Sequence, residues 1–381
     1  MNYVARRFEG RQAGLSLDAD ALSRYDDLID LSIGDTDFTT DKRIIDAAYA
    51  DALGGATRYG FPQGDPELIS AIRKAWREDF KQEISADEIV VTASSCLGMA
   101  LTMLAVLNPG DEVIVFGPYF AIYQQQIEVA GGVCVEVPTY ENEDYAVDEE
   151  RLERAITPRT RAIIFNNPCN PTGAAYGTDT LETLRRAALR HDLLIIADEI
   201  YTRYLFEGEF VPMRTLPDMA QRTVTLNSFS KNFMMTGWRV GFIIAPPPLR
   251  AAIQYVNGGM IYTAPSVSQR AAIRALALRD DIQRMYISKY KERVYYTADR
   301  IEKIPYMTLK RPRGTFYLFP GIERTGLSAP DFCAYALKNA HVLLSPGTAF
   351  GNAGKGHVRI ACTADAAILM QAMDRLAALK F

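Results

Sequence analysis

The chain has 381 residues, of which 48% are hydrophobic and 23% are charged. This balance is typical of a soluble globular protein, and the length suits one large domain with a smaller one. The formal net charge of −4 is spread along the chain, which argues against a nucleic-acid or anionic-membrane partner, because both need a concentrated basic surface.

Cysteines and histidines indicate neither a disulfide framework nor a metal site. The five cysteines are scattered singly with no CxxC pair, as is typical of free thiols in a reducing compartment. The three histidines have no ligand-like spacing, so we expect no metal. The first ten residues lack the apolar stretch of a secretory signal, and the longest apolar runs are too short to span a membrane. We therefore expect a cytoplasmic protein.

Short apolar runs alternate with longer helical patterns through the middle of the chain. Most of these runs are rich in Val, Ile and Leu, as are the buried strands of a parallel sheet. The predicted strands are residues 88–93, 112–116, 133–137, 162–165, 193–197, 223–227 and 240–244. Helical candidates between them are residues 97–107, 121–130 and 181–190. The alternation predicts an α/β fold with an open, mostly parallel seven-stranded sheet and a ligand at the carboxyl ends of its strands.

The last third of the chain has a different pattern, which indicates a smaller α+β domain. Its predicted elements are a long amphipathic helix (282–304), isolated strands (314–319 and 358–361) and a final helix (364–379). We expect an N-terminal segment that joins this small domain, a large domain and the small domain itself, at residues 1–45, 46–280 and 281–381.

Unusual residues follow four of the predicted strands. They are residues 94–96 (Ser-Ser-Cys), 166–173 (Asn-Asn-Pro-Cys-Asn-Pro-Thr-Gly), 198–201 (Asp-Glu-Ile-Tyr) and 228–231 (Ser-Phe-Ser-Lys). Small residues at a helix N-terminus suit a phosphate, and a lysine with a depressed pKa is a nucleophile. A carboxylate that ends a buried strand is expected to meet a cation. Taken singly, a helix cap, a turn or a solvated lysine explains each segment equally well.

The order and spacing of these segments are far more specific than any one of them. Asn-Pro-Thr-Gly (170–173), Asp-x-x-Tyr (198–201), Ser-x-Ser-Lys (228–231) and Gly-Trp-Arg (237–239) together resemble the class I/II aminotransferases of the aspartate aminotransferase superfamily. The resemblance runs from Gly34 to Arg359. It implies fold type I, with a large domain that binds pyridoxal 5′-phosphate (PLP). It also implies transfer of an amino group from aspartate, an aromatic or a neutral L-amino acid to a 2-oxo acid such as 2-oxoglutarate.

The resemblance assigns catalytic roles to Lys231, Asp198 and Tyr201. Lys231 is expected to form the Schiff base with PLP and then to move a proton, while Asp198 holds the ring nitrogen protonated. Tyr201 and Asn170 correspond to the donors to the ring hydroxyl oxygen, and Phe120 to the aromatic residue that stacks on the ring.

The phosphate is expected at the helix N-terminus. There the resemblance places Ser95 and Cys96, with Ser228 and Arg239 completing the grip. Cys96 has no histidine pattern to activate it, so we interpret it as a small buried residue rather than a nucleophile. Tyr59 corresponds to a tyrosine that reaches the phosphate of the partner subunit, which implies a homodimer with shared sites.

Substrate binding is assigned to three residues. Arg359 corresponds to the arginine that clamps the α-carboxylate, and Gly34 and Asn170 line the same pocket.

The residues that face the substrate side chain are less clear. We find no second arginine that matches the one that aspartate-specific relatives use for the distal carboxylate. Tyr119, Phe120 and Tyr262 are candidates for an apolar wall, and Arg11 is a candidate for a mobile cation. These residues together predict a fairly broad donor range.

Two other functions remain open. The runner-up is a PLP-dependent carbon–sulfur β-lyase, although Met-Thr-Gly-Trp-Arg at residues 235–239 resembles the transaminases more closely. A PLP-sensing regulator needs an attached DNA-binding domain. The roughly 35 residues before the aminotransferase-like part are fewer than the usual minimum of about 50 for a domain, which disfavours this function.

Overall fold

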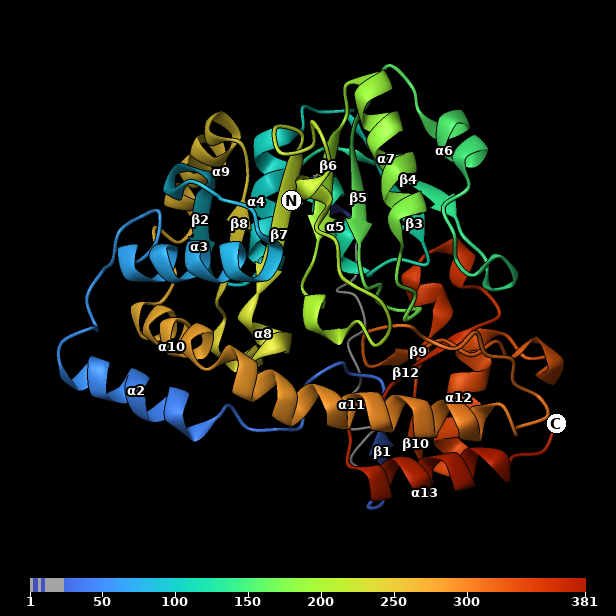
Figure 1. Cartoon of the computed structure of the whole chain (residues 1–381). Helices are drawn as coiled ribbons and strands as arrows, with labels where there is room; N and C mark the ends of the chain where they lie inside the picture. Colours follow the sequence, from blue (N-terminus) through green and yellow to red (C-terminus); the bar gives the residue numbers. More distant parts are fainter. Residues whose placement is uncertain (1–2, 6–7, 11–23) are drawn as a thin grey trace.

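The computed structural model describes residues 3–5, 8–10 and 24–381. Its largest element is a seven-stranded sheet with the order β2-β8-β7-β6-β5-β3-β4 (Figure 1). The strands are β2 (Ile89–Thr92), β3 (Glu112–Gly117), β4 (Val133–Pro138), β5 (Thr160–Asn166), β6 (Leu194–Asp198), β7 (Thr223–Ser228) and β8 (Gly241–Ile244). The five strands from β4 to β7 in this order are parallel, and β8 runs antiparallel to both β2 and β7. The predicted α/β fold is confirmed, with strand bounds that differ from the prediction by at most two residues.

Helices cover both faces of the sheet. Along β3, Val113 and Val115 face α4 (Ser95–Val106), α5 (Ile122–Val129) and α9 (Pro247–Met260), while Ile114 and Phe116 face the side of α6 (Glu149–Ala155) and α7 (Thr178–His191). All six residues of β3 are buried. The continuous apolar runs therefore reflect a sheet covered on both sides.

A second group of helices covers the β2 end of the sheet. It consists of α2 (Lys42–Leu53), α3 (Pro66–Phe80) and α10 (Ser266–Ala277), which share one apolar core with β2 and β8. Asp41 and Asp65 cap α2 and α3 by accepting hydrogen bonds from backbone N–H groups in the first turn.

The C-terminal part contains small sheets and three longer helices. The helices are α11 (Arg279–Ile301), α12 (Ala329–Ala340) and α13 (Ala366–Ala377). Strands β11 (Ser345–Pro346), β12 (Val358–Ala361) and β9 (Tyr317–Leu318) form an antiparallel sheet, in which β9 is shorter than the predicted strand 314–319.

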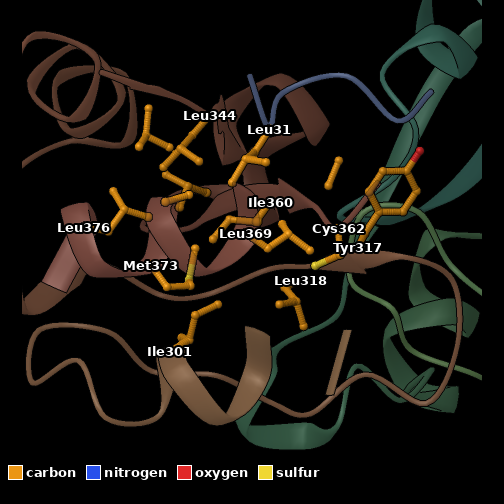
Figure 2. Close-up of a cluster of buried hydrophobic side chains, with 14 of the residues drawn as sticks. Leu31, Ile301, Tyr317, Leu318, Leu344, Ile360, Cys362, Leu369, Met373 and Leu376 are labelled. Atoms are coloured by element: carbon orange, nitrogen blue, oxygen red, sulfur yellow. The ribbon is translucent and has the colours of Figure 1, made fainter. Parts of the chain in front are cut away.

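The N-terminal segment joins this C-terminal part. Strand β1 (Ile29–Asp30) pairs in parallel with β10 (Val342–Leu343), and Leu31 packs in the same apolar cluster as Leu344 and Ile360 (Figure 2). Helix α11 runs without a break from the core under the large sheet to this second core (Figure 1). The division into domains at residues 45 and 280 stays a prediction.

Among the described residues, no helix is long and apolar enough to cross a membrane. The same part of the chain contains no group of three or more His, Cys, Asp or Glu side chains arranged to hold a metal ion.

Candidate active site

Two adjoining cavities lie where β5, β6 and β7 end. The first, which we call the Arg359 lobe, has a volume of about 340 Å³ and is lined by Ser32, Asn170, Tyr317 and Arg359. The second, the Arg239 lobe, has a volume of about 470 Å³. It is lined by residues at the start of α4, by Ser228 and by Arg239. Both lobes share a wall that consists of Ile33, Gly34, Phe120, Tyr123, Asp198, Ile200 and Lys231. The predicted ligand site at the strand ends is therefore a real cavity.

Lys231 lies in this shared wall on α8 (Phe229–Asn232), a single turn that directly follows β7. Ser228 begins the turn by accepting a hydrogen bond from the Ser230 N–H at 3.0 Å. The Lys231 Nζ donates to the Gly34 carbonyl at 2.5 Å. Burial, together with the positive charge of Arg359, lowers the pKa of the amine to about 8, although the charge of Asp35 opposes the shift. The neutral amine needed for nucleophilic or general-base chemistry is thus accessible near neutral pH.

Asp198 ends β6 and faces the same wall with one oxygen free. Its Oδ2 accepts a hydrogen bond from the Tyr123 hydroxyl at 2.5 Å, while its buried Oδ1 has no partner in the described part of the chain. Asn166 and Asn167 fix its backbone carbonyl at 2.9 and 3.1 Å. Burial raises the pKa of the carboxyl to about 6, and the bond from Tyr123 opposes that rise. A buried carboxylate oxygen without a partner is costly, so this site suits a cationic donor.

The cation expected to meet a carboxylate at the end of β6 is not a side chain of the described residues, and for Asp198 the expected partner stays the ring nitrogen of the cofactor. Neither Asp198 nor Glu199 lies in a salt bridge there; Glu199 accepts a hydrogen bond from the Met213 N–H at 3.0 Å. Arg214, whose charge lowers the pKa of Glu199, pairs with Glu88 at 2.6 Å instead. Burial is the larger effect and raises the pKa of Glu199 to about 8, so this carboxyl can be buried as the neutral acid.

Arg359 enters the cavity from β12. Its guanidinium donates to the Asn170 Oδ1 at 3.0 Å and to the Ser32 carbonyl at 2.5 Å, and its buried Nε has no partner in the described part of the chain. The rings of Tyr317 and Phe350 lie 4.6 and 4.7 Å from its central carbon. The two rings and two hydrogen bonds hold the guanidinium plane in place, an arrangement that suits a carboxylate ligand.

Tyr201 and Gly34 both contact Tyr317. The hydroxyls of Tyr201 and Tyr317 lie 3.1 Å apart. A Cβ on Gly34 would lie 1.8 Å from the Tyr317 hydroxyl oxygen, so glycine alone fits there. The ring of Tyr317 lies at the edge of the C-terminal apolar cluster (Figure 2). Tyr317 therefore packs in this cluster and lines the cavity as well.

The Arg239 lobe is built from a helix start and a tight turn. Ser94 has a φ of 88° and caps α4, so that Ser95 and Cys96 form its first turn at the cavity wall. A Cβ on Gly241 would lie 2.7 Å from the Ser95 nitrogen, so this strand approaches the helix start closely. Arg239 donates to the Thr236 carbonyl at 2.9 Å. The free N–H groups of the helix start and this guanidinium face one space, as an anion site requires.

Cys96 keeps its proton in this lobe. Burial raises the pKa of its thiol, although the positive charge of Arg239 opposes the rise. A thiol in this state is a poor nucleophile, although Cys96 is half-buried and not fully buried as the sequence interpretation has it.

Phe120 lines both lobes, but two other predicted wall residues do not. Tyr119 is buried elsewhere, and its hydroxyl hydrogen-bonds Gln124 Oε1 at 3.0 Å. Tyr262 packs edge to face against Tyr59 at 5.6 Å and lines a groove outside the lobes. Within the subunit, the predicted apolar wall is therefore wrong at both positions, because neither ring lines a lobe. Tyr59 itself is 88% exposed and lines neither lobe. Residue 11, predicted as a mobile cation, lies outside the described residues.

The comparisons with known proteins agree with this geometry. The family model for aminotransferase class I and II matches residues 26–376. The chain belongs to this family. It is 37% identical over 357 residues to an aspartate/prephenate aminotransferase of Thermus thermophilus, covering 92% of this chain and 90% of that protein. It is 36% identical to an arginine–pyruvate transaminase of Pseudomonas aeruginosa, covering 94% and 92%. A solved aspartate aminotransferase of Thermus thermophilus, a single mutant, superimposes with a TM-score of 0.94 at 32% identity and covers 99% of both chains.

This aminotransferase has three cavity residues that sequence reasoning missed. Tyr123 bonds Asp198, Tyr317 bonds Tyr201, and Ser32 bonds Arg359 through its carbonyl. Tyr123 follows Phe120 by three residues at a predicted helix start, so its helical spacing was an available signal. Tyr317 lies in β9 and Ser32 just after β1, two strands of two residues each in which no motif marks these positions.

Proposed function

We propose that this aminotransferase binds PLP through Lys231 and transfers an amino group between an L-amino acid and a 2-oxo acid. The main support for this proposal is that the amine of Lys231, the free oxygen of Asp198 and the guanidinium of Arg359 all face one cavity. These three groups supply a nucleophilic amine, an acceptor for a cation and a carboxylate clamp, which are the parts that this reaction needs.

The polar groups that line the cavity fit PLP. The unpartnered Asp198 Oδ1 suits a protonated ring nitrogen, and the start of α4 with Arg239 suits the phosphate. Phe120 lies in the wall between the lobes, where its ring is available for stacking. When bound, PLP supplies an electron sink for the electrons left by breaking the substrate Cα–H bond.

The protein side chains do the rest of the work in this proposal. Asp198 holds the proton on the ring nitrogen, and Tyr201 and Asn170 line the Arg359 lobe, where they are expected to donate to the ring hydroxyl oxygen. Arg359 binds the α-carboxylate and so sets the orientation of the Cα–H bond. With substrate bound, the Nζ of Lys231 would be a free amine, which would take the proton from Cα and deliver it to C4′ of the cofactor as a general acid.

We further propose a donor range of aspartate, neutral and aromatic amino acids with 2-oxoglutarate as acceptor. The names of the relatives include aspartate, prephenate and arginine, which supports variation at the side-chain end. Among the described residues that line the two lobes, the basic side chains are Lys231, Arg239 and Arg359, and each already has a proposed role. An unpaired distal carboxylate costs several kcal/mol, on the order of a hundredfold in binding. Aspartate and 2-oxoglutarate both carry one, so the proposed range requires a cation such as Arg11, or a polar contact, from outside these lining residues.

We also propose a homodimer. Large aromatic side chains are exposed around the grooves next to Tyr59, namely Phe61 (63%), Tyr255 (86%) and Tyr262 (48%). Exposed apolar patches of this kind mark interfaces between proteins. Tyr59 is expected to reach the site of a neighbouring subunit, and this requires a partner on the same face.

The proposed compartment is the cytoplasm. It rests on the cysteines, all five of which are free thiols. Fractionation of the producing cells tests this placement.

A half-reaction screen tests the function. Purified protein loaded with PLP is mixed with each amino acid, and the loss of the visible absorbance and the appearance of the 2-oxo acid are followed. We expect conversion with several neutral and aromatic donors and restoration of the absorbance by 2-oxoglutarate. Release of pyruvate and ammonia from cysteine-type donors, without transamination of any donor, would contradict the proposal and favour the β-lyase.

A further inference from the structure

The hydrogen bond between Tyr123 and Asp198 is a feature that the proposed roles do not use. Tyr123 is 3% exposed, and its hydroxyl donates to Asp198 Oδ2 at 2.5 Å. A hydroxyl has a single proton to donate, so this proton is committed to one carboxylate oxygen. The other oxygen, Oδ1, is buried with no partner among the described residues.

Tyr123 lies where it contacts two parts of the cavity wall at once. It is in the first turn of α5, and its ring meets that of Phe120 edge to face at 5.6 Å. Both residues belong to the wall that the two lobes share. One helix start therefore carries the expected stacking residue and the donor to Asp198.

We propose that Tyr123 is a positioning residue that fixes the Asp198 carboxylate with Oδ1 facing the ring nitrogen of PLP. This inference rests on the proposed function, because it assigns to Tyr123 a role in holding the cofactor that function requires. The bond does two things: it selects one orientation of the carboxylate, and it stabilises its charged form.

The electrostatics around Tyr123 support this role. Burial and the neighbouring Asp198 both raise the pKa of the Tyr123 hydroxyl well above its ordinary value, so it remains a proton donor. Its bond also counters the effect of burial on the Asp198 carboxyl. Among the described residues, the Tyr123 hydroxyl is the one side chain that donates a hydrogen bond to the Asp198 carboxylate.

Tyr119 provides a matched control. It is also a buried tyrosine, it precedes α5 by three residues, and its hydroxyl bonds Gln124 on the same helix at 3.0 Å. It lines neither lobe. Removing either hydroxyl costs one buried hydrogen bond at this helix start, but only Tyr123 connects to Asp198.

The experiment measures dissociation constants for PLP and for its ring-carbon analogue, in which C–H replaces the ring nitrogen. Both ligands keep the aldehyde and the phosphate. We expect Tyr123→Phe to weaken PLP binding about tenfold, the scale of a lost hydrogen bond to a charged group, and the analogue by less than about twofold. Tyr119→Phe is expected to leave both constants unchanged. Thermal unfolding of both variants checks that the fold is kept.

The outcomes separate this inference from the proposed function. Equal losses for both ligands in Tyr123→Phe, or no loss for either, would show that Tyr123 does not act through the ring nitrogen. In that case PLP binding by the wild-type protein would leave the proposed function standing. Failure of the wild-type protein to bind PLP would overturn the proposed function itself.

Discussion

The two lobes of the cavity differ in where their residues come from. The Arg239 lobe draws Ser95 and Ser228 from the ends of strands in a single sheet, which also supplies Asp198 to the wall that both lobes share. The Arg359 lobe draws Ser32 from the N-terminal segment and Arg359 from the small C-terminal sheet, more than 300 residues apart. One rigid sheet thus positions the expected cofactor end, whereas the expected substrate end depends on contacts between distant parts of the chain. We infer that chemistry is determined in the first lobe and substrate choice in the second.

The largest expected effect is at the residue between the lobes. Lys231→Ala removes the amine that both binds the cofactor and moves the proton, so we expect transamination to fall by roughly 10⁴-fold or more. The fold is expected to remain, because the buried amine with its lowered pKa serves the site rather than the core. Steady-state rates and thermal unfolding check the two parts. A variant with normal turnover would contradict the assignment.

The next effect separates the lobes. Arg359→Ala removes the carboxylate clamp and leaves the Arg239 lobe intact, so we expect kcat/KM to fall by roughly 10²- to 10³-fold for every donor alike. Binding of PLP is expected to stay within about twofold, because the lost contact is outside the cofactor end. A donor panel and a PLP titration measure both. Loss restricted to one class of donor would assign Arg359 to the side chain instead of the α-carboxylate.

The same difference explains how far the sequence could predict the site. Asn170, Asp198 and Lys231 follow buried strands, so their convergence follows from the order of a parallel sheet. Tyr317 lies in a strand of two residues, too short to show any period, and its contact with Tyr201 depends on tertiary packing. Tyr262 was predicted as a wall residue from its aromatic side chain alone, but the direction of this side chain depends on how the chain leaves α9.

The fold divides in the same way. The strands of the large sheet were predictable because most of them contain a buried run of apolar residues, whereas β1, β10 and β11 have two residues each. Such short pairings are set by contacts between distant segments and not by local pattern. The sequence predicted that the N-terminal segment joins the small domain, but it did not predict that residues 29–30 pair with β10.

A pH-dependent stability is expected from the Arg239 lobe. Asp198 has a pKa of about 6 when folded and 3.8 ordinarily, so between these values the folded state holds a proton that the unfolded state has lost. The cost of burying the charge is absent below pH 3.8 and complete above pH 6. We expect Asp198→Asn to raise the free energy of unfolding of the PLP-free protein by about 2 kcal/mol more at pH 7 than at pH 4.

Urea unfolding at the two pH values measures this difference. Glu199, whose pKa is also raised, is present in both proteins, and only the smallest cause of its shift, the charge of Asp198, differs between them. An Asp198→Asn variant that gains no stability over wild type between pH 4 and pH 7 would contradict the burial of an ionised carboxylate in this lobe.

The smallest effect concerns the contribution of a partner subunit. If Tyr59 reaches the phosphate of a neighbouring site, Tyr59→Phe removes one hydrogen bond and weakens PLP binding by roughly three- to tenfold. Relative rates across the donor panel are expected not to change, because the Arg359 lobe is untouched. Tyr255→Phe, at another tyrosine of the exposed aromatic face, is the control. A fully active monomer in sedimentation under assay conditions would rule out the shared site.

The most direct test is to identify the lysine that holds the cofactor. Protein loaded with PLP is reduced with borohydride, which makes the lysine–cofactor linkage permanent, and then digested and mapped by mass spectrometry. The account predicts the modification on Lys231, and its loss when an amino-acid donor is added before reduction. Modification of a different lysine, or no modification of a protein that still transaminates, would contradict it.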